Sequence, residues 1–333
     1  ANPELRWEKT KQLNVGIEFS MLKNSISGTI DYYLKKSSDL LATKNINSTY
    51  GFTSAKFNVG AIDNEGIDIS VSYNLRKKDF YWRTTLIYSH NTNIITKTDK
   101  DIILNNTSIS TALMYQQYRV VQGRPRFNLV SMPWGGLDNQ GYPQFIYKDS
   151  VYNWRTPQSP LWTNYKFADL KYEGTTLAPN YGSWNNVIAY KGFELSFLMS
   201  FKFGHVYQHT APFRVSNNDL FGIAQGNYIS HYAKEFEKMW KNPGDELTTD
   251  IPRLPFELTG AQVRALTVWY TYPVNYGSHQ TQSAAHIRFQ RVSLSYSMDA
   301  ELLFIIFHKS NYRLDFPGFG FIDDGGNPAD YFP

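Results

Sequence analysis

Large apolar side chains alternate with mostly polar or small ones over residues 193–204. The apolar positions are Phe193, Leu195, Phe197, Met199, Phe201 and Phe203. A period of two predicts an extended strand with one apolar and one polar face. The apolar face covers ten residue steps, roughly 33 Å at about 3.3 Å per step, whereas strands usually have about five or six residues. Tilted by about 40°, it would rise roughly 25 Å, the height of the lipid-facing band of an outer-membrane barrel.

The same alternation recurs elsewhere in the chain, in segments that short polar connections join in pairs. These pairs are 13–21 with 26–34, 67–75 with 80–88, and 184–190 with 193–204. Long alternating segments with such short connections predict antiparallel hairpins. Two further strands are predicted, at 287–298 and, more weakly, at 312–316. The apolar positions of the first change parity near Gln290, which predicts a β-bulge there.

The connections alternate between a few residues and several tens of residues. The long ones are residues 36–65, about 90–181 and about 205–285, all of which we expect to be loops. Bacterial outer-membrane barrels have short periplasmic turns and longer extracellular loops, whereas a soluble sandwich needs no such asymmetry. We therefore predict an all-β fold, an antiparallel transmembrane β-barrel with long extracellular loops. The predicted lipid-facing residues are Leu13, Val15, Ile17, Phe19, Leu195, Phe197, Met199 and Phe201.

Composition agrees with a membrane barrel and excludes several other classes. The 333 residues are 42% hydrophobic and 16% aromatic, yet no run approaches the 18 or so apolar residues of a transmembrane helix. The net charge of +4 is small and unclustered, so we expect no nucleic-acid partner. The chain has no cysteine and hence no disulfide framework. Ala1–Glu4 lacks signal-peptide features, so we expect these residues to be an internal piece of a longer chain.

Several stretches, taken in chain order, carry a recognisable pattern. They are Asn2–Thr10 followed by Leu13–Ile17, Asn58–Gly60 with Asn64–Ile67, Gly136–Asp138 with Gly141 and Pro143, Pro179–Leu195, Trp240–Asp245 with Ile251–Arg253, and Ile287–Tyr296. Across about 300 residues this succession resembles SusC/RagA-type TonB-dependent transporters. The tail after Phe316 fits that family poorly.

The resemblance implies a 22-stranded outer-membrane barrel with an N-terminal plug, of which residues 1–333 would be the C-terminal part. It implies import of glycans or peptides through a multi-pass barrel embedded in outer-membrane lipid. The implied partners are a SusD-like lid lipoprotein and, through the missing N-terminal part, the TonB–ExbB–ExbD complex. The plug and the TonB box are absent from these residues.

Candidate reactive groups are few. His205 and His209 have an H-x-x-x-H spacing, which would place both imidazoles on one face of a helix, but loop histidines are favoured because a strand precedes them. Asp323 and Asp324 adjoin two glycines and favour an acidic turn over a calcium site. The chain lacks the nucleophile-elbow, Walker A and Rossmann glycine motifs. We therefore predict no enzymatic activity, no metal and no cofactor.

The long connections are rich in aromatic residues. Trp134, Tyr142, Trp154 and Trp162 are candidates for contact with substrate or lid, because flat apolar faces with polar rims suit sugar rings and peptide side chains. The favoured alternative is that they hold the loops together or pack against the lid. Other aromatic residues near strand ends are predicted to form girdles at the membrane interface: Tyr32, Tyr33, Tyr88, Trp184 and Tyr190.

Two other architectures fit parts of the pattern. A soluble β-sandwich that binds carbohydrate would also have strands with one apolar face. A small outer-membrane barrel enzyme is disfavoured, because the sequence lacks the residues for a catalytic site.

Overall fold

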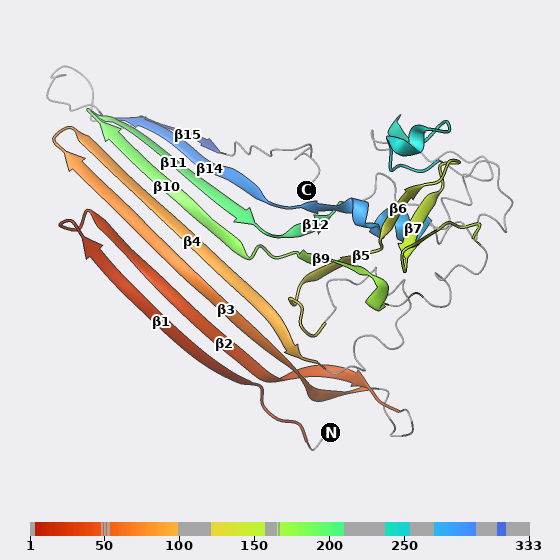
Figure 1. Ribbon diagram of the computed structural model, residues 1–333. Coiled ribbons are helices and arrows are strands. Elements are labelled where there is room, and N and C mark those ends of the chain that lie inside the picture. The colour runs from red at the N-terminus through yellow and green to blue at the C-terminus, as the bar shows by residue number, and fades with distance from the viewer. Residues whose placement is uncertain are drawn as a thin grey trace.

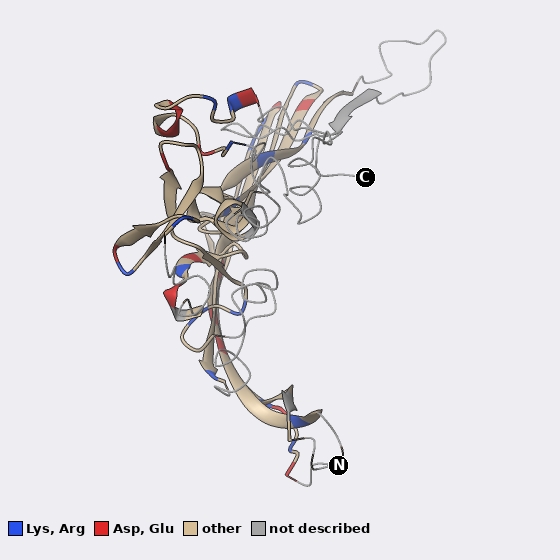
Figure 2. Ribbon diagram, turned by 90° about the vertical axis from the view of Figure 1, so that its right-hand side faces the viewer, with Lys and Arg blue, Asp and Glu red and all other residues tan. Residues whose placement is uncertain are grey.

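Eight antiparallel strands form one long, curved sheet in a computed structural model (Figure 1). The model describes residues 4–47, 49, 51, 54–98, 121–156, 165, 167–209, 237–253, 270–297 and 312–317. The strands are, in sheet order, β1 Lys9–Met21, β2 Ile26–Asn45, β3 Ser54–Lys77, β4 Phe80–Lys97, β10 Asn180–Tyr190, β11 Phe193–Phe203, β14 His286–Tyr296 and β15 Tyr312–Pro317. Seen from the side, the sheet is a single curved layer (Figure 2). The all-β, antiparallel prediction is confirmed.

The predicted hairpins are present with tight turns. Tyr190 pairs with Phe193 across a two-residue turn, and Lys191 and Gly192 both have positive φ angles, 46° and 86°. Positive φ at both central residues is the requirement of a type I′ turn, whose twist matches the flanking strands. Lys77 pairs with Phe80 across an equally short turn. These turns lie at one end of the sheet (Figure 1).

The predicted bulge is also confirmed. The pairing of β11 with β14 shifts between Leu198, which is opposite Arg291, and Met199, which is opposite Phe289. Gln290 is the extra residue, and its side-chain amide donates to the Ser200 hydroxyl at 2.7 Å. The bulge explains why the apolar residues of β14 change parity there.

The prediction that residues 36–65 form a loop is wrong. β2 continues to Asn45 and β3 begins at Ser54, so most of the stretch is a paired hairpin. The pairing is irregular near Asp39, which has a φ of 59°. Polar residues also interrupt the apolar pattern here, including Lys36 and Asp63, which form an ion pair at 3.3 Å. The two strands continue beyond the apolar band, where the alternation that signals a half-buried strand is lost.

The two faces of the sheet differ sharply in chemistry. Ile17 is 63% exposed and Leu195 39% exposed on the apolar face. On the opposite face small polar residues are buried, among them Ser89, Ser196 and Ser293. A soluble sandwich would bury the apolar face instead. No helix in the described ranges is long and apolar enough to cross a membrane.

All eight predicted lipid-facing residues lie on the apolar face, with unequal exposure. Leu13, Val15, Ile17 and Leu195 are exposed, whereas Phe19, Phe197, Met199 and Phe201 are partly covered. Phe19 and Phe201 each lie over a cross-strand glycine, Gly28 and Gly182. Such rings cover backbone that a glycine leaves bare.

The girdle prediction is wrong for Tyr33. Its ring lies over Gly66 on the polar face, and its hydroxyl accepts a hydrogen bond from the Asn91 side chain at 2.6 Å. Tyr32 lies on the opposite face and donates to Glu65 at 2.8 Å. Adjacent strand residues point to opposite faces, so the two tyrosines cannot both face outward.

The second and third long connections contain structure of their own. Beyond the end of the sheet opposite the short turns they form small sheets (Figure 1). Their strands are β5 Asn128–Ser131 with β9 Lys171–Thr175; β6 Trp134–Leu137, β7 Pro143–Tyr147 and β8 Ser150–Tyr152; and β12 Val206–Gln208 with β13 Thr281–Ser283. Short helical turns are η3 Phe167–Asp169, η5 Asp245–Leu247, η6 Tyr270–Val274 and η7 Ser278–Gln280. We call this part of the molecule the loop outcrop.

The loop outcrop holds most of the buried apolar side chains among the described residues. Val130, Met132, Phe145 and Val274 are almost completely covered. Met132 forms a parallel bridge to Gly277, which joins the two connections although they are far apart in sequence. The outcrop therefore has its own small core, distinct from the large sheet.

Candidate functional site

The β6–β7–β8 meander positions two of the predicted aromatic residues next to each other. Tyr142 directly precedes β7, and Trp154 follows β8. Their ring centroids are 5.4 Å apart with an interplanar angle of 65°, a T-shaped contact. Trp134, at the start of β6, lies in a separate cluster, and Trp162 lies outside the described residues. Of the four aromatic residues predicted from the sequence, the fold thus brings Tyr142 and Trp154 together.

Asp138 shapes the turn that presents Tyr142. Its Oδ1 accepts backbone hydrogen bonds from Gln140 and Tyr142, both at 2.9 Å. Its Oδ2 accepts from the Asn153 side chain at 3.4 Å, which links the turn to the segment before Trp154. One carboxylate therefore holds both aromatic segments.

Two arginines complete the cluster. The Arg155 guanidinium lies 4.7 Å from the Tyr142 centroid and 4.6 Å from the Trp154 ring. The Arg253 guanidinium lies 5.7 Å from the Tyr142 centroid and 5.6 Å from the Trp240 ring. We call Tyr142, Trp154, Arg155, Trp240 and Arg253 the aromatic–arginine cluster. A guanidinium group over an aromatic face makes a favourable cation–π interaction with the negative face of the ring.

Members of the cluster differ in how accessible they are. Tyr142 and Trp240 are buried, at 4% and 6% exposure, so their rings pack the outcrop together. Trp154 is partly exposed and Arg155 is exposed, with one guanidinium nitrogen donating to the Gln140 side chain at 2.6 Å. Arg253 is partly exposed as well, so a partner could reach Trp154, Arg155 and Arg253 but not the two buried rings.

Trp240 was not among the predicted site residues. Hydrogen bonds hold it and the residues that follow it in place. Its indole N–H donates to Glu246 at 2.9 Å, and this bond lowers the pKa of that carboxyl. Asp245 accepts from the backbone N–H groups of Asn242 and Lys241, which lower its pKa in the same way. The Trp240 ring packs against Gly141, where an added Cβ would clash with the ring. No periodic pattern in the sequence signals these contacts.

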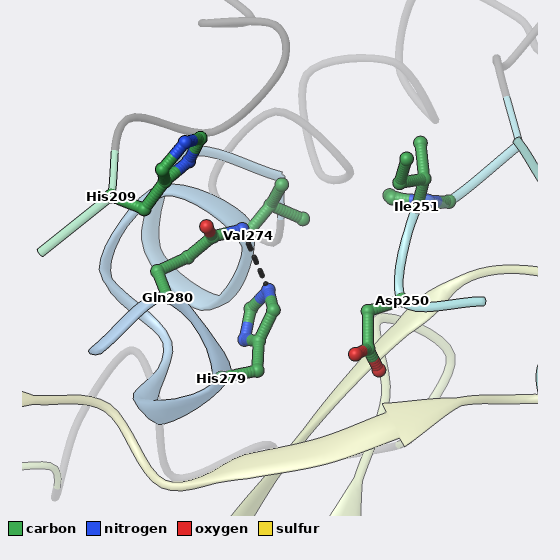
Figure 3. A pocket seen from close by; sticks show the side chains of 7 residues that line it. His209, Asp250, Ile251, Val274, His279 and Gln280 are labelled. Carbon is green, nitrogen blue, oxygen red and sulfur yellow. Dashed lines mark hydrogen bonds between the residues drawn. The ribbon is translucent and has the colours of Figure 1, made fainter. Parts of the chain in front are cut away.

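Trp134 belongs to a second cluster around a cavity of about 150 Å³ (Figure 3). Its indole N–H donates to Asp250 at 3.0 Å, and its ring stacks on His279 with centroids 3.9 Å apart. The cavity is lined by His209, Asp250, Ile251, Pro252, Val274, His279 and Gln280. The view shows His279 and Gln280 on one side and Asp250 on the other.

His279 is neutral at pH 7 in this environment. Burial lowers its pKa to about 4, although the nearby Asp250 charge acts in the opposite direction. The Gln280 amide nitrogen lies 3.0 Å from Nε2, so that ring nitrogen accepts the hydrogen bond. The imidazole therefore packs as an uncharged ring against Trp134, with one nitrogen hydrogen-bonded.

The two histidines with H-x-x-x-H spacing do not share a helix. His205 and His209 flank β12, and His205 instead lies near His286, with ring centroids 6.0 Å apart. Across the described ranges, three or more His, Cys, Asp or Glu side chains nowhere gather in a way that could hold a metal ion. Asp323 and Asp324 lie outside those ranges.

A comparison with known families identifies the architecture. The family model "TonB dependent receptor-like, beta-barrel" matches residues 1–197, more than half of the chain. The chain belongs to the TonB-dependent receptor family of β-barrels. The predicted relationship is confirmed, and the soluble β-sandwich alternative is wrong. This is a family of outer-membrane receptors and transporters rather than enzymes.

Individual TonB-dependent receptors match at moderate identity. The chain is 25% identical to TonB-dependent receptor P39 of Formosa agariphila, over 91% of this chain and 30% of that protein. It is 30% identical to TonB-dependent receptor SusC of Bacteroides thetaiotaomicron, over 44% of this chain and 17% of that protein. The chain spans less than a third of the length of these relatives.

Solved structures of the RagAB peptide importer share the fold of this chain. The RagAB peptide importer in the closed-closed state superposes with a TM-score of 0.63 and 20% identity, over 90% of this chain and 30% of that chain. The RagAB peptide transporter gives a TM-score of 0.64 and 18% identity, over 96% of this chain. The sheet and loop outcrop therefore follow the course of a barrel of this type.

Proposed function

We propose that the chain forms part of a SusC-like outer-membrane importer that takes up glycans or peptides. The sheet carries this proposal, because an exposed apolar face opposite a buried polar face suits a lipid-embedded wall around a polar lumen. The likeness to SusC in sequence and to the RagAB peptide importer in fold supports it. No catalytic role is proposed.

The proposed lipid contact involves the apolar face of β1 and β11. Outer-membrane lipid covers Leu13, Val15, Ile17, Phe19, Leu195, Phe197, Met199 and Phe201. Residues 1–333 then form the C-terminal part of a larger multi-pass barrel, and a plug that precedes them in the full protein fills the lumen. TonB–ExbB–ExbD supplies energy through that preceding part.

A SusD-like lipoprotein docks on the loop outcrop in this proposal. Trp154 and Arg155 contribute the contact, since they combine an accessible ring with an accessible charge. Tyr142 and Trp240 support them from beneath, because they are buried. Aromatic residues and arginine are the residue types that dominate binding energy at protein interfaces.

The test uses the full-length transporter with its lipoprotein. Trp154→Ala combined with Arg155→Ala is expected to weaken lipoprotein binding about 30-fold or more, because truncating even one interface anchor costs on the order of 2 kcal/mol. Lys148→Ala is the matched control, since Lys148 is exposed in the β7–β8 turn of the same meander. Unchanged binding by the double variant would remove the docking assignment. Mass spectrometry of the ligand that co-purifies with the complex then decides between glycan and peptide.

A further inference from the structure

A second cavity lies at the opposite end of the sheet from the loop outcrop. Its volume is about 290 Å³, and it lies where the turn between β3 and β4 meets the turn between β10 and β11. The Lys191 N–H donates to the Asp79 carbonyl at 3.2 Å, and the Ser297 N–H donates to the Gly192 carbonyl at 2.8 Å. We call it the rim cavity. On the proposed function the sheet is part of an outer-membrane barrel, whose short turns are its periplasmic ends, and this would place the rim cavity at the periplasmic leaflet.

Basic side chains outnumber acidic ones around the rim cavity, three to two. Arg76, Lys78 and Lys191 line it and are exposed. None of these three makes an ion pair within the described part of the chain. Arg76 lies 5.1 Å from the Tyr81 ring centroid, and Lys191 lies 5.3 Å from that of Tyr190. Unpaired cations at a membrane surface attract lipid phosphate.

Two carboxylates, Asp79 and Glu194, line the same cavity. They are exposed as well. The rim cavity thus offers groups for an anion and groups for a cation at once. A zwitterionic headgroup with a phosphate and a primary ammonium matches both kinds of charge.

Aromatic rings border the rim cavity on the apolar face of the sheet. Phe80, Tyr190 and Phe193 line it, and Tyr190 and Phe193 are 52% and 55% exposed. Phe193 also contacts Tyr296, with ring centroids 4.4 Å apart. Aromatic belts of this kind lie at headgroup level, next to the start of the acyl chains.

We propose that the rim cavity binds the headgroup of an aminophospholipid from the periplasmic leaflet. The phosphate contacts Lys78 and Lys191, and the ammonium group contacts Asp79, which lies in the same turn as Lys78. The acyl chains run outward along the aromatic rings. A volume near the lower end of small-molecule sites, roughly 300–1,000 Å³, suits a headgroup rather than a whole lipid. This role concerns anchoring in the membrane and needs no particular transport substrate.

The test titrates the purified full-length protein in detergent with phosphatidylethanolamine or with phosphatidylcholine of the same acyl chains, followed by native mass spectrometry. Lys78→Asn with Lys191→Asn keeps residues that tolerate positive φ, as these turns require. We expect phosphatidylethanolamine binding to weaken about 25-fold, at about fivefold per basic residue. Lys23→Asn is the control, since Lys23 lies in the β1–β2 turn with a φ of 56° and does not line the cavity.

A second variant separates the ammonium contact from the phosphate contact. Asp79→Asn is expected to abolish the preference for phosphatidylethanolamine over phosphatidylcholine while phosphatidylcholine binding is retained. The heat-dependent gel shift of a folded barrel confirms that each variant is intact. Wild-type levels of lipid binding by the lysine variant, or equal binding of the two lipids by the wild type, would overturn the proposal. Trp154→Ala should bind lipid normally, so the lipid site can fail independently of the docking site.

Discussion

At the scale of single residues, the loop outcrop depends on backbone geometry that its sequence barely signals. Gly141 has a φ of 77°, and Trp240 packs on the side where a Cβ would be. Gly136 has a similar φ of 85°, but nothing lies within 4 Å of the position of its Cβ. Substituting each glycine therefore distinguishes two effects: both substitutions strain the backbone, but only a side chain at Gly141 would overlap another residue.

We predict that Gly141→Ala disrupts the outcrop much more than Gly136→Ala does. Both substitutions incur the cost of positive φ, about 1 kcal/mol or more, but only the first displaces the Trp240 ring. Hydrogen exchange of the backbone amides in residues 134–147 measures the difference in the full-length protein. Equal loss of protection in the two variants would show that the Trp240 contact adds nothing.

His279 makes the outcrop sensitive to acid. Its native pKa of about 4 is below the unfolded value of about 6.5, so the unfolded state binds more protons between these pH values. The contribution of neutral His279 to the free energy of unfolding is therefore fully present above about pH 6.5. It is lost as the pH falls toward 4, by about 3 kcal/mol in total. Hydrogen exchange around Trp134 as a function of pH measures this loss. His279→Gln should flatten the profile, and an unchanged profile would assign the acid sensitivity to other groups.

At the scale of strands and hairpins, sequence alone predicted much of the large sheet. Alternation located β1, β11 and β14, and the parity change near Gln290 located the bulge. It missed the far ends of β2 and β3, because the adjacent Leu40 and Leu41 and the register shifts beside them break the period-two signal. It also missed the pairing of Trp240 with Gly141, since contacts between distant loops depend on tertiary structure rather than on local pattern.

The two faces of a strand should respond differently to a charge. Phe197→Arg, in the middle of β11, is expected to cost about 2–4 kcal/mol in the folding free energy of the barrel, because it would place a guanidinium in hydrocarbon. Ser183→Arg on the polar face of β10 should cost far less, because its side chain can reach a hydrated lumen. Urea titrations of the full-length protein in lipid vesicles measure both, and equal costs would contradict the proposed lipid contact.

At the scale of the whole molecule, the sheet has edges that require partners. β1 and β15 stand at its two sides. An exposed strand edge carries unpaired backbone groups, which a membrane cannot tolerate and which a closed barrel satisfies. The proposed additional strands of the full-length protein supply that closure.

We predict that the full-length protein fractionates with the outer membrane and leaves it only in detergent. The reason is the continuous apolar face, on which Ile17 and Leu195 are exposed. Washing the membranes with alkaline carbonate, which strips peripheral proteins, is the control. Recovery of the full-length protein in the carbonate supernatant would exclude a lipid-embedded wall.

The extended hairpin of β2 and β3 affects the height of the proposed barrel wall. From Lys36 to Asn45 it continues for nine residue steps, roughly 30 Å, past the apolar band. The ladder between the two strands is interrupted near Asp39 but resumes from Leu41 to Asn45, and the Lys36–Asp63 ion pair lies before the interruption, so the hairpin stays paired along most of this length. The hairpin therefore extends the wall of the proposed barrel well past the part that lipid would cover.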